Sequence, residues 1–343
     1  MNTSDFSLRL LQWYERNGRE LPWRGTQDAY RVWVSEVILQ QTRVAQGYDY
    51  FLRFVERFPT VEALAAASED EVLRLWQGLG YYTRARNLRQ AARQIVEMGG
   101  FPTDYATIRR LKGVGDYTAA AIASLAFGLP HAVVDGNVYR VLSRHFGIDT
   151  PIDTTGGRKL FAAMAQEMLV VGRPADYNQA IMDFGALVCT PKSPQCEACP
   201  LMETCQARTD GRVEQLPQKA HVTRVRDRFF TYVYIRFAHE TILQQRPAGD
   251  IWQGLYQMPM RESERPMTLA EVEKWLGEYG RLKKLCTDHR HQLSHQRLHA
   301  DLYLLKAGHR PSMDGDWINE TQFDEYAVPR LVEELLKCVS RNF

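Results

Sequence analysis

The sequence predicts a chain of two domains, an all-α domain followed by a smaller α+β domain. Its 343 residues exceed the usual length of one domain. Helical periodicity runs through most of residues 6–187, whereas residues 229–237 and 241–245 are short runs rich in β-branched and aromatic side chains. Residues 209–228 hold Pro, Gly and charged side chains without apolar periodicity, which is typical of a linker. We therefore expect domains at 1–208 and 229–343.

The composition is that of an ordinary globular protein. The chain carries 43 Lys and Arg against 41 Asp and Glu, a formal net charge of +2, so any basic surface must be local. No run of about 18 apolar residues is present, and the first residues lack the basic and apolar parts of a signal peptide. These features predict a cytoplasmic protein that makes no contact with a membrane.

Two glycines between helical segments form the first candidate site. Gly113 and Gly115 flank Val114, with helical patterns at 105–110 and 119–127. Such a hairpin places backbone N–H groups at a helix N-terminus, where they suit a phosphate of DNA. A plain glycine-bearing turn between two helices has the same pattern.

Two carboxyl residues are candidates for acid–base chemistry. Glu36 lies in the helical segment 30–42 and shares a face with Trp33 and Leu39, so desolvation should raise its pKa and favour the acid form. Asp135 follows two valines and precedes Gly-Asn, at the expected N-cap of a helix, where it should stay ionised beside Asn137. An amphipathic-helix glutamate and an ordinary cap are the alternative interpretations.

Four of the six cysteines crowd into one loop, with the spacing Cys189-x6-Cys196-x2-Cys199-x5-Cys205. Only one pair has the Cys-x2-Cys spacing of structural zinc sites, so a [4Fe–4S] cluster is favoured over zinc. Cys286 and Cys338 stand apart and are expected to be ordinary buried thiols. The histidines of residues 289–299 have no cysteine companion and are not expected to bind zinc.

These motifs together resemble the helix-hairpin-helix DNA glycosylase superfamily, and within it the MutY family of adenine DNA glycosylases. The resemblance rests on Ser-Glu-x-x-Leu-Gln-Gln-Thr at 35–42, the Gly-Val-Gly hairpin, Asp-Gly-Asn-Val at 135–138 and the cysteine loop, and it covers essentially the whole chain. It implies hydrolytic removal of adenine mispaired with 8-oxoguanine or guanine in duplex DNA, a [4Fe–4S] cluster, a Nudix-like second domain and a monomeric enzyme. The cluster would be structural, shaping a loop that includes Lys192.

The resemblance also implies roles for single residues. Glu36 would protonate adenine N7 and Asp135 would face the sugar cation, a division of labour that the chemistry of two carboxyls also favours. Tyr117 and Asn137 complete the catalytic set, and Tyr117 should bond near Asp135 or the sugar. The residues expected to contact the target base, the opposite base or the duplex are Trp23, Arg24, Leu39, Gln40, Gln41, Thr42, Tyr81, Gly113, Gly115, Ser294 and His295.

Residue 117 separates this chain from related enzymes. In endonuclease III-type glycosylases a lysine at the matching position attacks the sugar, and Tyr117 cannot form a Schiff base. Tyr139 likewise stands where some relatives carry lysine. We therefore expect a monofunctional glycosylase, the alternatives being an endonuclease III-like enzyme for oxidised pyrimidines and a non-catalytic iron–sulfur DNA-binding protein.

The second domain departs from its implied family in two places. Residues 251–259 are similar to a Nudix segment, but no glutamate-rich helix follows to hold magnesium, so hydrolysis of nucleoside diphosphates is not expected. The lesion-reading loop of the family, Phe-Ser-His, is here Leu293-Ser294-His295. Leucine in place of the aromatic residue leaves the fit around 8-oxoguanine less defined by sequence.

Overall fold

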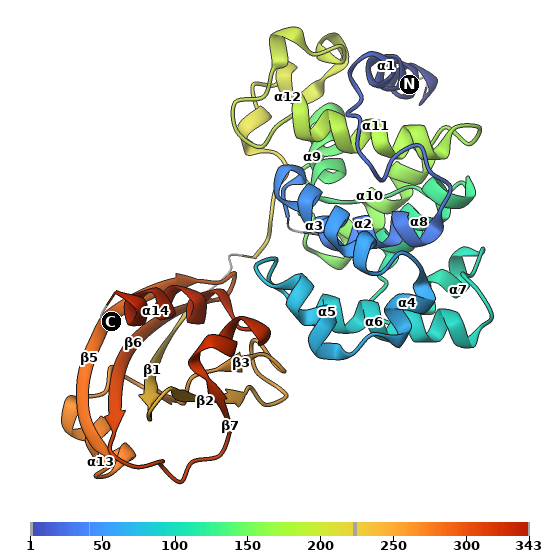
Figure 1. Ribbon diagram of the computed structural model, residues 1–343. Coiled ribbons are helices and arrows are strands. Elements are labelled where there is room, and N and C mark those ends of the chain that lie inside the picture. The colour runs from blue at the N-terminus through green and yellow to red at the C-terminus, as the bar shows by residue number, and fades with distance from the viewer. Residues whose placement is uncertain (1–2, 41, 222–224, 342–343) are drawn as a thin grey trace. The chain divides into compact units, whose positions relative to one another are not determined.

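The computed structural model describes residues 3–40, 42–221 and 225–341. The backbone divides into two compact units, one of residues 1–66 and 87–222 and the other of residues 67–86 and 223–343. Figure 1 shows the first as helical and the second as built around strands. A segment from the N-terminal half of the sequence, residues 67–86, therefore groups with the second unit. None of the described helices is both long and apolar enough to cross a membrane.

Most helices of residues 3–209 lie where the sequence predicts helical periodicity, and short connections join them. They are α1 (Thr3–Asn17), α2 (Ala29–Leu39), α3 (Val44–Arg57), α4 (Val61–Ala66), α5 (Glu69–Trp76), α6 (Thr83–Glu97), α7 (Tyr105–Arg110), α8 (Asp116–Phe127), α9 (Gly136–Phe146), α10 (Thr155–Met168), α11 (Pro174–Leu187) and α12 (Gln206–Thr209). Short 3-10 turns η1 (Cys196–Ala198), η2 (Met202–Thr204) and η3 (Val213–Gln215) lie around α12. Residues 61–79 have a helical pattern throughout but form two helices, because Ser68 caps α5 by accepting a hydrogen bond from Glu71 N–H.

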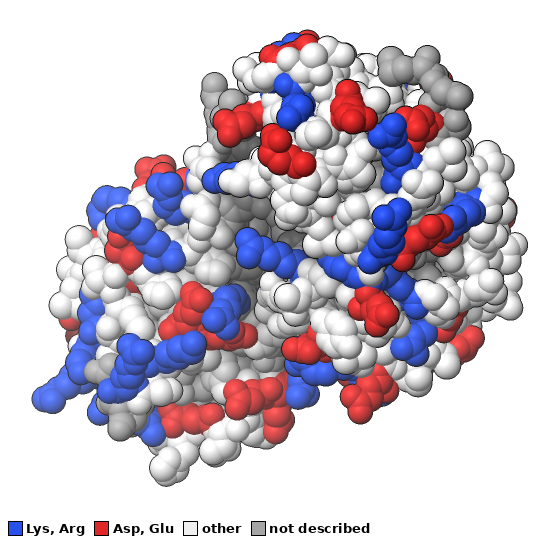
Figure 2. Space-filling model, turned by 90° about the horizontal axis from the view of Figure 1, so that it is seen from above, with Lys and Arg blue, Asp and Glu red and all other residues white. Residues whose placement is uncertain are grey.

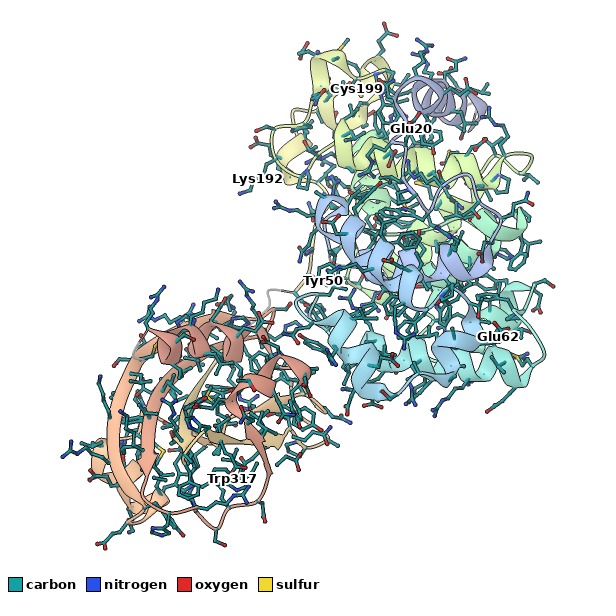
Figure 3. All side chains as sticks on the ribbon, in the orientation of Figure 1. Glu20, Tyr50, Glu62, Lys192, Cys199 and Trp317 are labelled. Atoms are coloured by element: carbon teal, nitrogen blue, oxygen red, sulfur yellow. A yellow bond between two sulfur atoms is a disulfide. The ribbon has the colours of Figure 1, made fainter. Side chains whose placement is uncertain are left out.

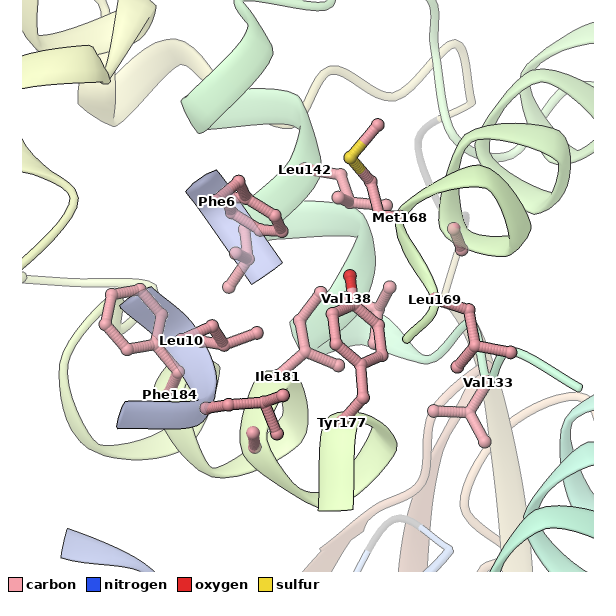
Figure 4. Packing of buried hydrophobic residues seen from close by; sticks show 14 of the residues in the cluster. Phe6, Leu10, Val133, Val138, Leu142, Met168, Leu169, Tyr177, Ile181 and Phe184 are labelled. Atoms are coloured by element: carbon pink, nitrogen blue, oxygen red, sulfur yellow. The ribbon is translucent and has the colours of Figure 1, made fainter. Parts of the chain in front are cut away.

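Helix α8 shows how the sequence builds the helical unit. Five consecutive residues, 119–123, are buried, and four of them are alanines. Small side chains let neighbouring helices approach closely, and α8 packs against α2, α7 and α11. One apolar cluster joins α8, through Ala120 and Ala121, to α1, α9, α10 and α11, and it includes Phe6, Val138 and Phe184 (Figure 4). These helices hold the residues on either side of the candidate site.

The second unit contains two antiparallel or mixed sheets. Its elements are β1 (Arg226–Arg236), β2 (Glu240–Gln245), β3 (Tyr256–Gln257), β4 (Met260–Ser263), α13 (Leu269–Leu276), β5 (Gly280–Gln292), β6 (Gln296–Ala307), β7 (Asp316–Asn319), η4 (Glu320–Glu325) and α14 (Arg330–Ser340). The four-stranded sheet has the order β4-β1-β6-β5, with β1 and β6 parallel, and the three-stranded sheet has the order β3-β2-β7. Helix α14 packs on one face of the larger sheet through Leu331, Val332 and Leu335.

Two features of this unit differ from the prediction. The prediction of free thiols at Cys286 and Cys338 is wrong, because a disulfide joins Cys286 on β5 to Cys338 on α14, with 6.6 Å between the Cα atoms. The 13-residue strand β5 was not predicted as a strand, because its exposed and half-buried side chains do not alternate and its register shifts twice, between Lys284 and Cys286 and between Cys286 and His289.

Candidate active site

A cavity of about 1200 Å³ lies within the helical unit and brings most of the predicted site residues together. The predicted residues that line it are Trp23, Arg24, Glu36, Leu39, Gln40, Thr42, Gly113, Gly115, Tyr117, Asp135 and Asn137. Gln41 lies outside the described residues. Tyr81, Ser294 and His295 belong to the second unit and do not line this cavity.

Glu36 lies on a helix that is buried almost all round. Eight of the ten other residues of α2 are buried, and Glu36 itself is only 7% exposed. Loss of solvent raises the pKa of Glu36 to about 7, and the nearby charge of Asp135 adds to this, against the lowering effect of a hydrogen bond from Tyr117. That hydroxyl donates to Glu36 Oε2 at 2.6 Å. A carboxyl held at this pKa can give a proton near neutral pH.

Asp135 is the N-cap of α9, as predicted. Its Oδ1 accepts hydrogen bonds from the backbone N–H groups of Asn137 and Val138, at 2.9 and 2.8 Å, and its Oδ2 accepts from Asn137 Nδ2 at 2.8 Å. Burial raises the pKa of Asp135, and these three hydrogen bonds lower it. Burial thus raises the pKa of both carboxyls, and the three hydrogen bonds are what favours the ionised form that we expect for Asp135.

Tyr117 bonds to a partner that the sequence did not name. Its hydroxyl donates to Glu36 and also lies 3.4 Å from Met182 Sδ, in the cavity that Asp135 lines as well. Residue 117 is in the first turn of α8 and faces the cavity between α2 and α9. Burial and the carboxylates of Glu36 and Asp135 raise its pKa well above the ordinary value, so the phenol stays protonated and acts as a donor.

Arg140 connects Asp135 to the cysteine loop and was missed by the sequence reasoning. Its Nη2 donates to Asn137 Oδ1 at 2.7 Å and to the Gly185 carbonyl at 2.6 Å, and its Nε donates to the Cys189 carbonyl at 2.6 Å. Asn137 in turn donates to Asp135. The only sequence signal was an arginine one turn after Asn137 on the same helix face.

Arg24 reaches the cavity wall through a buried acid that the sequence did not reveal. Asp183 on α11 is fully buried and accepts two hydrogen bonds from Arg24, each at 2.7 Å, and others from Arg19. These arginines lower the pKa of Asp183 against the effect of burial. A buried carboxylate with two arginine partners fixes the Arg24 guanidinium beside the cavity.

The two glycines of the hairpin differ in backbone conformation and in the space around them. Gly113 has φ of +75°, and a Cβ there would lie 2.6 Å from Asn87 Cβ, so a side chain is excluded on two grounds. Gly115 has φ of −91° and caps α8, and a Cβ there would meet open space. Only the first glycine is required by the backbone, while the second keeps the rim of the cavity open.

Tyr81 and Ser294, predicted from separate motifs, meet within the second unit. The Tyr81 hydroxyl and Ser294 Oγ form a hydrogen bond, and Tyr81 is 48% exposed with φ of +49°. The turn before Tyr81 is tied to the same unit, because Gln77 Oε1 accepts from Val328 N–H at 3.3 Å. His295 is an exposed residue next to Ser294 at the end of the β5–β6 hairpin.

The cysteine loop brings four free thiols into one short segment, and thiolates are the ligands of iron–sulfur clusters. Cys189, Cys196, Cys199 and Cys205 are all free and half-buried. Burial, together with the other three thiols, raises the pKa of Cys199 to about 11, a cost that bound iron would offset because thiolates bind it as anions. Within the described ranges, no group of three or more His, Cys, Asp or Glu side chains is found that could hold a metal ion.

Charges around these sites are mixed. The face in Figure 2 shows lysine and arginine side chains interspersed with acidic ones, as the small net charge predicts. Lys192 is exposed on the cysteine loop, at the same side of the helical unit as Cys199 (Figure 3). Any attraction for a polyanion therefore depends on local groups rather than on the total charge.

Comparison with known proteins places the fold. Residues 34–162 match the HhH-GPD superfamily of base excision DNA repair proteins, residues 189–205 the iron-sulfur binding domain of endonuclease III, and residues 231–338 the NUDIX domain. A solved thermostable thymine-DNA glycosylase superimposes with a TM-score of 0.57 at 29% identity, covering 61% of this chain and 97% of its own. A DNA complex of endonuclease III, at 21% identity and a TM-score of 0.53, shares the fold over 62% of this chain and 98% of its own. The fold and cavity thus define a DNA-binding glycosylase of base excision repair with an iron–sulfur loop.

Individual relatives narrow this class. An adenine DNA glycosylase of Buchnera aphidicola subsp. Schizaphis graminum is 31% identical over 340 residues, covering 97% of this chain and 98% of the relative. The human adenine DNA glycosylase is 46% identical over 222 residues, which cover 62% of this chain and 41% of the human protein. The chain belongs to the adenine DNA glycosylase family, and it is an adenine-specific DNA glycosylase.

Proposed function

We propose that this enzyme removes adenine mispaired with 8-oxoguanine or guanine, hydrolyses the glycosidic bond without cutting the strand, and carries a [4Fe–4S] cluster. One observation carries the proposal: Glu36, with a pKa of about 7, faces the same cavity as the capped carboxyl of Asp135. Two carboxyls flanking a sugar–base bond can divide the work of protonating the leaving group and stabilising the cation.

The acid step belongs to Glu36. The target adenosine leaves the base stack and enters the cavity, because duplex DNA hides the bond that must break. Protonated Glu36 gives its proton to adenine N7, and the bond between the base nitrogen and C1′ then breaks with its electron pair going to the base. Trp23, Arg24 and Leu39 form the walls that hold the base.

Asp135 stabilises the sugar cation. Its carboxylate stabilises the positive charge that develops at C1′, and the hydrogen bonds from Asn137 and Val138 keep it in place. Water then adds to C1′ and gives its proton to the Glu36 carboxylate, which restores the acid. The products are adenine and an abasic site, and the proton count balances.

A monofunctional reaction follows from the side chains at the reaction centre. An amine nucleophile would form a Schiff base with the sugar and lead to strand cleavage. Residues 117 and 139, which line the same cavity as Asp135, are both tyrosines. Neither can form that adduct, and Tyr117 is occupied as a donor to Glu36.

Reading of the opposite base is assigned to Ser294 and His295 in the second unit, with Tyr81 as a wedge and Gln40, Gln41 and Thr42 near that base. The hydrogen bond between Tyr81 and Ser294 supports a shared task for these two residues. Ser294 and His295 can donate hydrogen bonds to the lesion, while Leu293 adds an apolar contact in place of an aromatic one. Gly113 and Gly115 bind a phosphate through backbone N–H groups.

The four cysteines at 189–205 would hold the cluster, which supplies structural bonds that shape the loop carrying Lys192. We further propose domains at 1–208 and 229–343 joined by a linker at 209–228, in an enzyme that acts as a monomer. Magnesium-dependent hydrolysis by the second domain is not part of the proposal.

Base release from defined duplexes tests the proposal. The full chain is incubated with adenine opposite 8-oxoguanine, guanine or thymine, and with thymine glycol opposite adenine, and free base and strand breaks are measured separately. Adenine release in the order 8-oxoguanine, guanine, thymine, without strand breaks or borohydride-trapped adduct, is expected. Release of thymine glycol alone or a trapped adduct would refute it, and iron analysis with the visible spectrum tests the cluster.

A further inference from the structure

The cavity extends beyond the groups that the chemistry uses. At about 1200 Å³ it exceeds the roughly 300–1000 Å³ of pockets that enclose a drug-sized ligand, and a single flipped base fills only part of it. The cavity is also bounded by α10 and by His131, Ala132 and Val134 of the loop that leads into Asp135. A wall this close to the sugar must meet another part of the DNA.

Helix α10 presents one face to this part of the cavity. Arg158, Ala162 and Gln166 are spaced four residues apart, so they lie in a row on the helix, and all three line the cavity. Gln166 accepts a hydrogen bond from Ala132 N–H at 3.1 Å and donates to the Pro130 carbonyl at 2.8 Å. Ala162, in the middle of the row, has a small side chain that leaves space in the cavity. Arg158 lies at one end of the row.

The loop that faces α10 is rigidly held. Asn178, fully buried on α11, accepts from Val133 N–H at 3.1 Å and donates to the His131 carbonyl at 2.8 Å. The His131 ring stacks on Tyr105, with 4.3 Å between the ring centroids and an interplanar angle of 16°. His131 is therefore fixed four residues before Asp135, and its ring also lines the cavity.

Three polar side chains around this part of the cavity have few or no protein partners. Within residues 3–40, 42–221 and 225–341, the Arg158 guanidinium makes no ion pair, and its only hydrogen bond is to the Asp153 carbonyl at 3.3 Å. In the same ranges neither ring nitrogen of His131 nor the hydroxyl of Tyr139 has a hydrogen-bond partner. The charge of Arg158 acts on the Tyr139 hydroxyl, so these two groups lie near each other. An arginine is always charged and matches the geometry of a phosphate.

We propose that Arg158, His131 and Tyr139 form a phosphate-binding subsite for the strand that carries the target adenosine. Tyr139 lies one helical turn beyond Asp135 on the same face of α9, so this subsite continues the wall that holds the sugar. The subsite would bind a phosphate next to the flipped nucleotide. Its residues are separate in sequence from the Gly113–Gly115 hairpin. The inference rests on the proposed position of the adenosine between Glu36 and Asp135.

Affinity for DNA as a function of salt tests this subsite. The full chain and its Arg158→Ala variant are titrated with a duplex that carries a tetrahydrofuran abasic analogue opposite guanine, at several KCl concentrations. Losing one phosphate contact should weaken binding about tenfold and reduce the salt slope by about 1. Arg158→Lys should recover most of the slope. His131→Phe, which keeps the stack on Tyr105, should weaken binding by a smaller factor.

Two controls decide the outcome. Lys159→Ala removes a neighbouring exposed charge that does not line the cavity, and it should bind as the unchanged chain does. Duplexes with one methylphosphonate linkage, placed in turn at each phosphate around the analogue, locate the contact: at one linkage the Arg158→Ala loss should disappear. Additive losses at every linkage, or equal effects of Arg158→Ala and Lys159→Ala, would overturn the inference. Because this binding needs no base release, failure of the proposed chemistry would be seen separately in adenine release.

Discussion

The Tyr117 hydroxyl donates a hydrogen bond to Oε2 of Glu36 at 2.6 Å, joining the start of α8 to the buried helix α2. This bond favours the charged carboxylate, while burial and the nearby Asp135 favour the neutral acid. The balance gives Glu36 a pKa of about 7. One phenol thus keeps the acid within the pH range in which it can both give and take a proton.

Removing that phenol should move the pH dependence in a predictable direction. Tyr117→Phe deletes the hydrogen bond that lowers the Glu36 pKa, so this pKa should rise and the acid form should persist to higher pH. In single-turnover adenine release, the alkaline limb of the rate profile should shift upward relative to the unchanged enzyme. Tyr105→Phe, which changes a tyrosine with no hydrogen bond to Glu36, is the control. A downward shift for Tyr117→Phe would contradict the account.

The buried Asp183 should be essential for stability. Asp183→Asn removes the negative charge between Arg24 and Arg19. The Arg24 side chain is only 12% exposed, and breaking such a buried ion pair costs about 3–5 kcal/mol of unfolding free energy. Urea unfolding followed by circular dichroism measures this loss. Asp176→Asn breaks an exposed pair with Arg173 on the same helix and should cost less than about 1 kcal/mol. Equal losses of unfolding free energy for the two substitutions would contradict the expected effect of burial.

The link through Arg140 should couple the reaction centre to the cysteine loop. Arg140→Met removes the donors to Asn137 and to the carbonyls of Gly185 and Cys189, leaving buried acceptors without partners. We expect adenine release to fall by about 10²-fold and bound iron to be lost faster on dilution. Arg140→Lys should not restore both, because one ammonium cannot span the three acceptors. Retained activity together with retained iron in Arg140→Met would exclude this coupling.

The disulfide should contribute to the stability of the second unit. It closes a segment with a sequence separation of 52 residues, for which loop entropy predicts about 4 kcal/mol. Cys286→Ser with Cys338→Ser should lower the free energy of unfolding of the second unit, measured by urea titration, by a matching amount. Peptide mapping without reductant should recover the two cysteines in one linked peptide, and free thiols at both positions in an oxidised sample would contradict the pairing.

Local patterns predicted those features that depend on neighbours in the sequence. The burial of Glu36 follows from apolar residues three and four positions away, and the Asp135 cap follows from Asp-Gly-Asn at a helix start. Three other contacts join residues 45 to 164 positions apart in sequence, so periodicity carried no signal for them: Tyr117 with Glu36, Asp183 with Arg19, and Arg140 with Gly185. The raised pKa of Asp135 depends on tertiary burial, which a cap motif alone does not report.

The rate of adenine release from an adenine–8-oxoguanine duplex as a function of pH, in single turnover with enzyme in excess, tests the central claim most directly. With Glu36 as the acid at a pKa of about 7, the rate should fall about tenfold per pH unit well above pH 7, and Glu36→Gln should lose at least about 10²-fold at every pH while remaining folded. A rate that rises through pH 7, or a Glu36→Gln enzyme as fast as the unchanged one, would contradict the account.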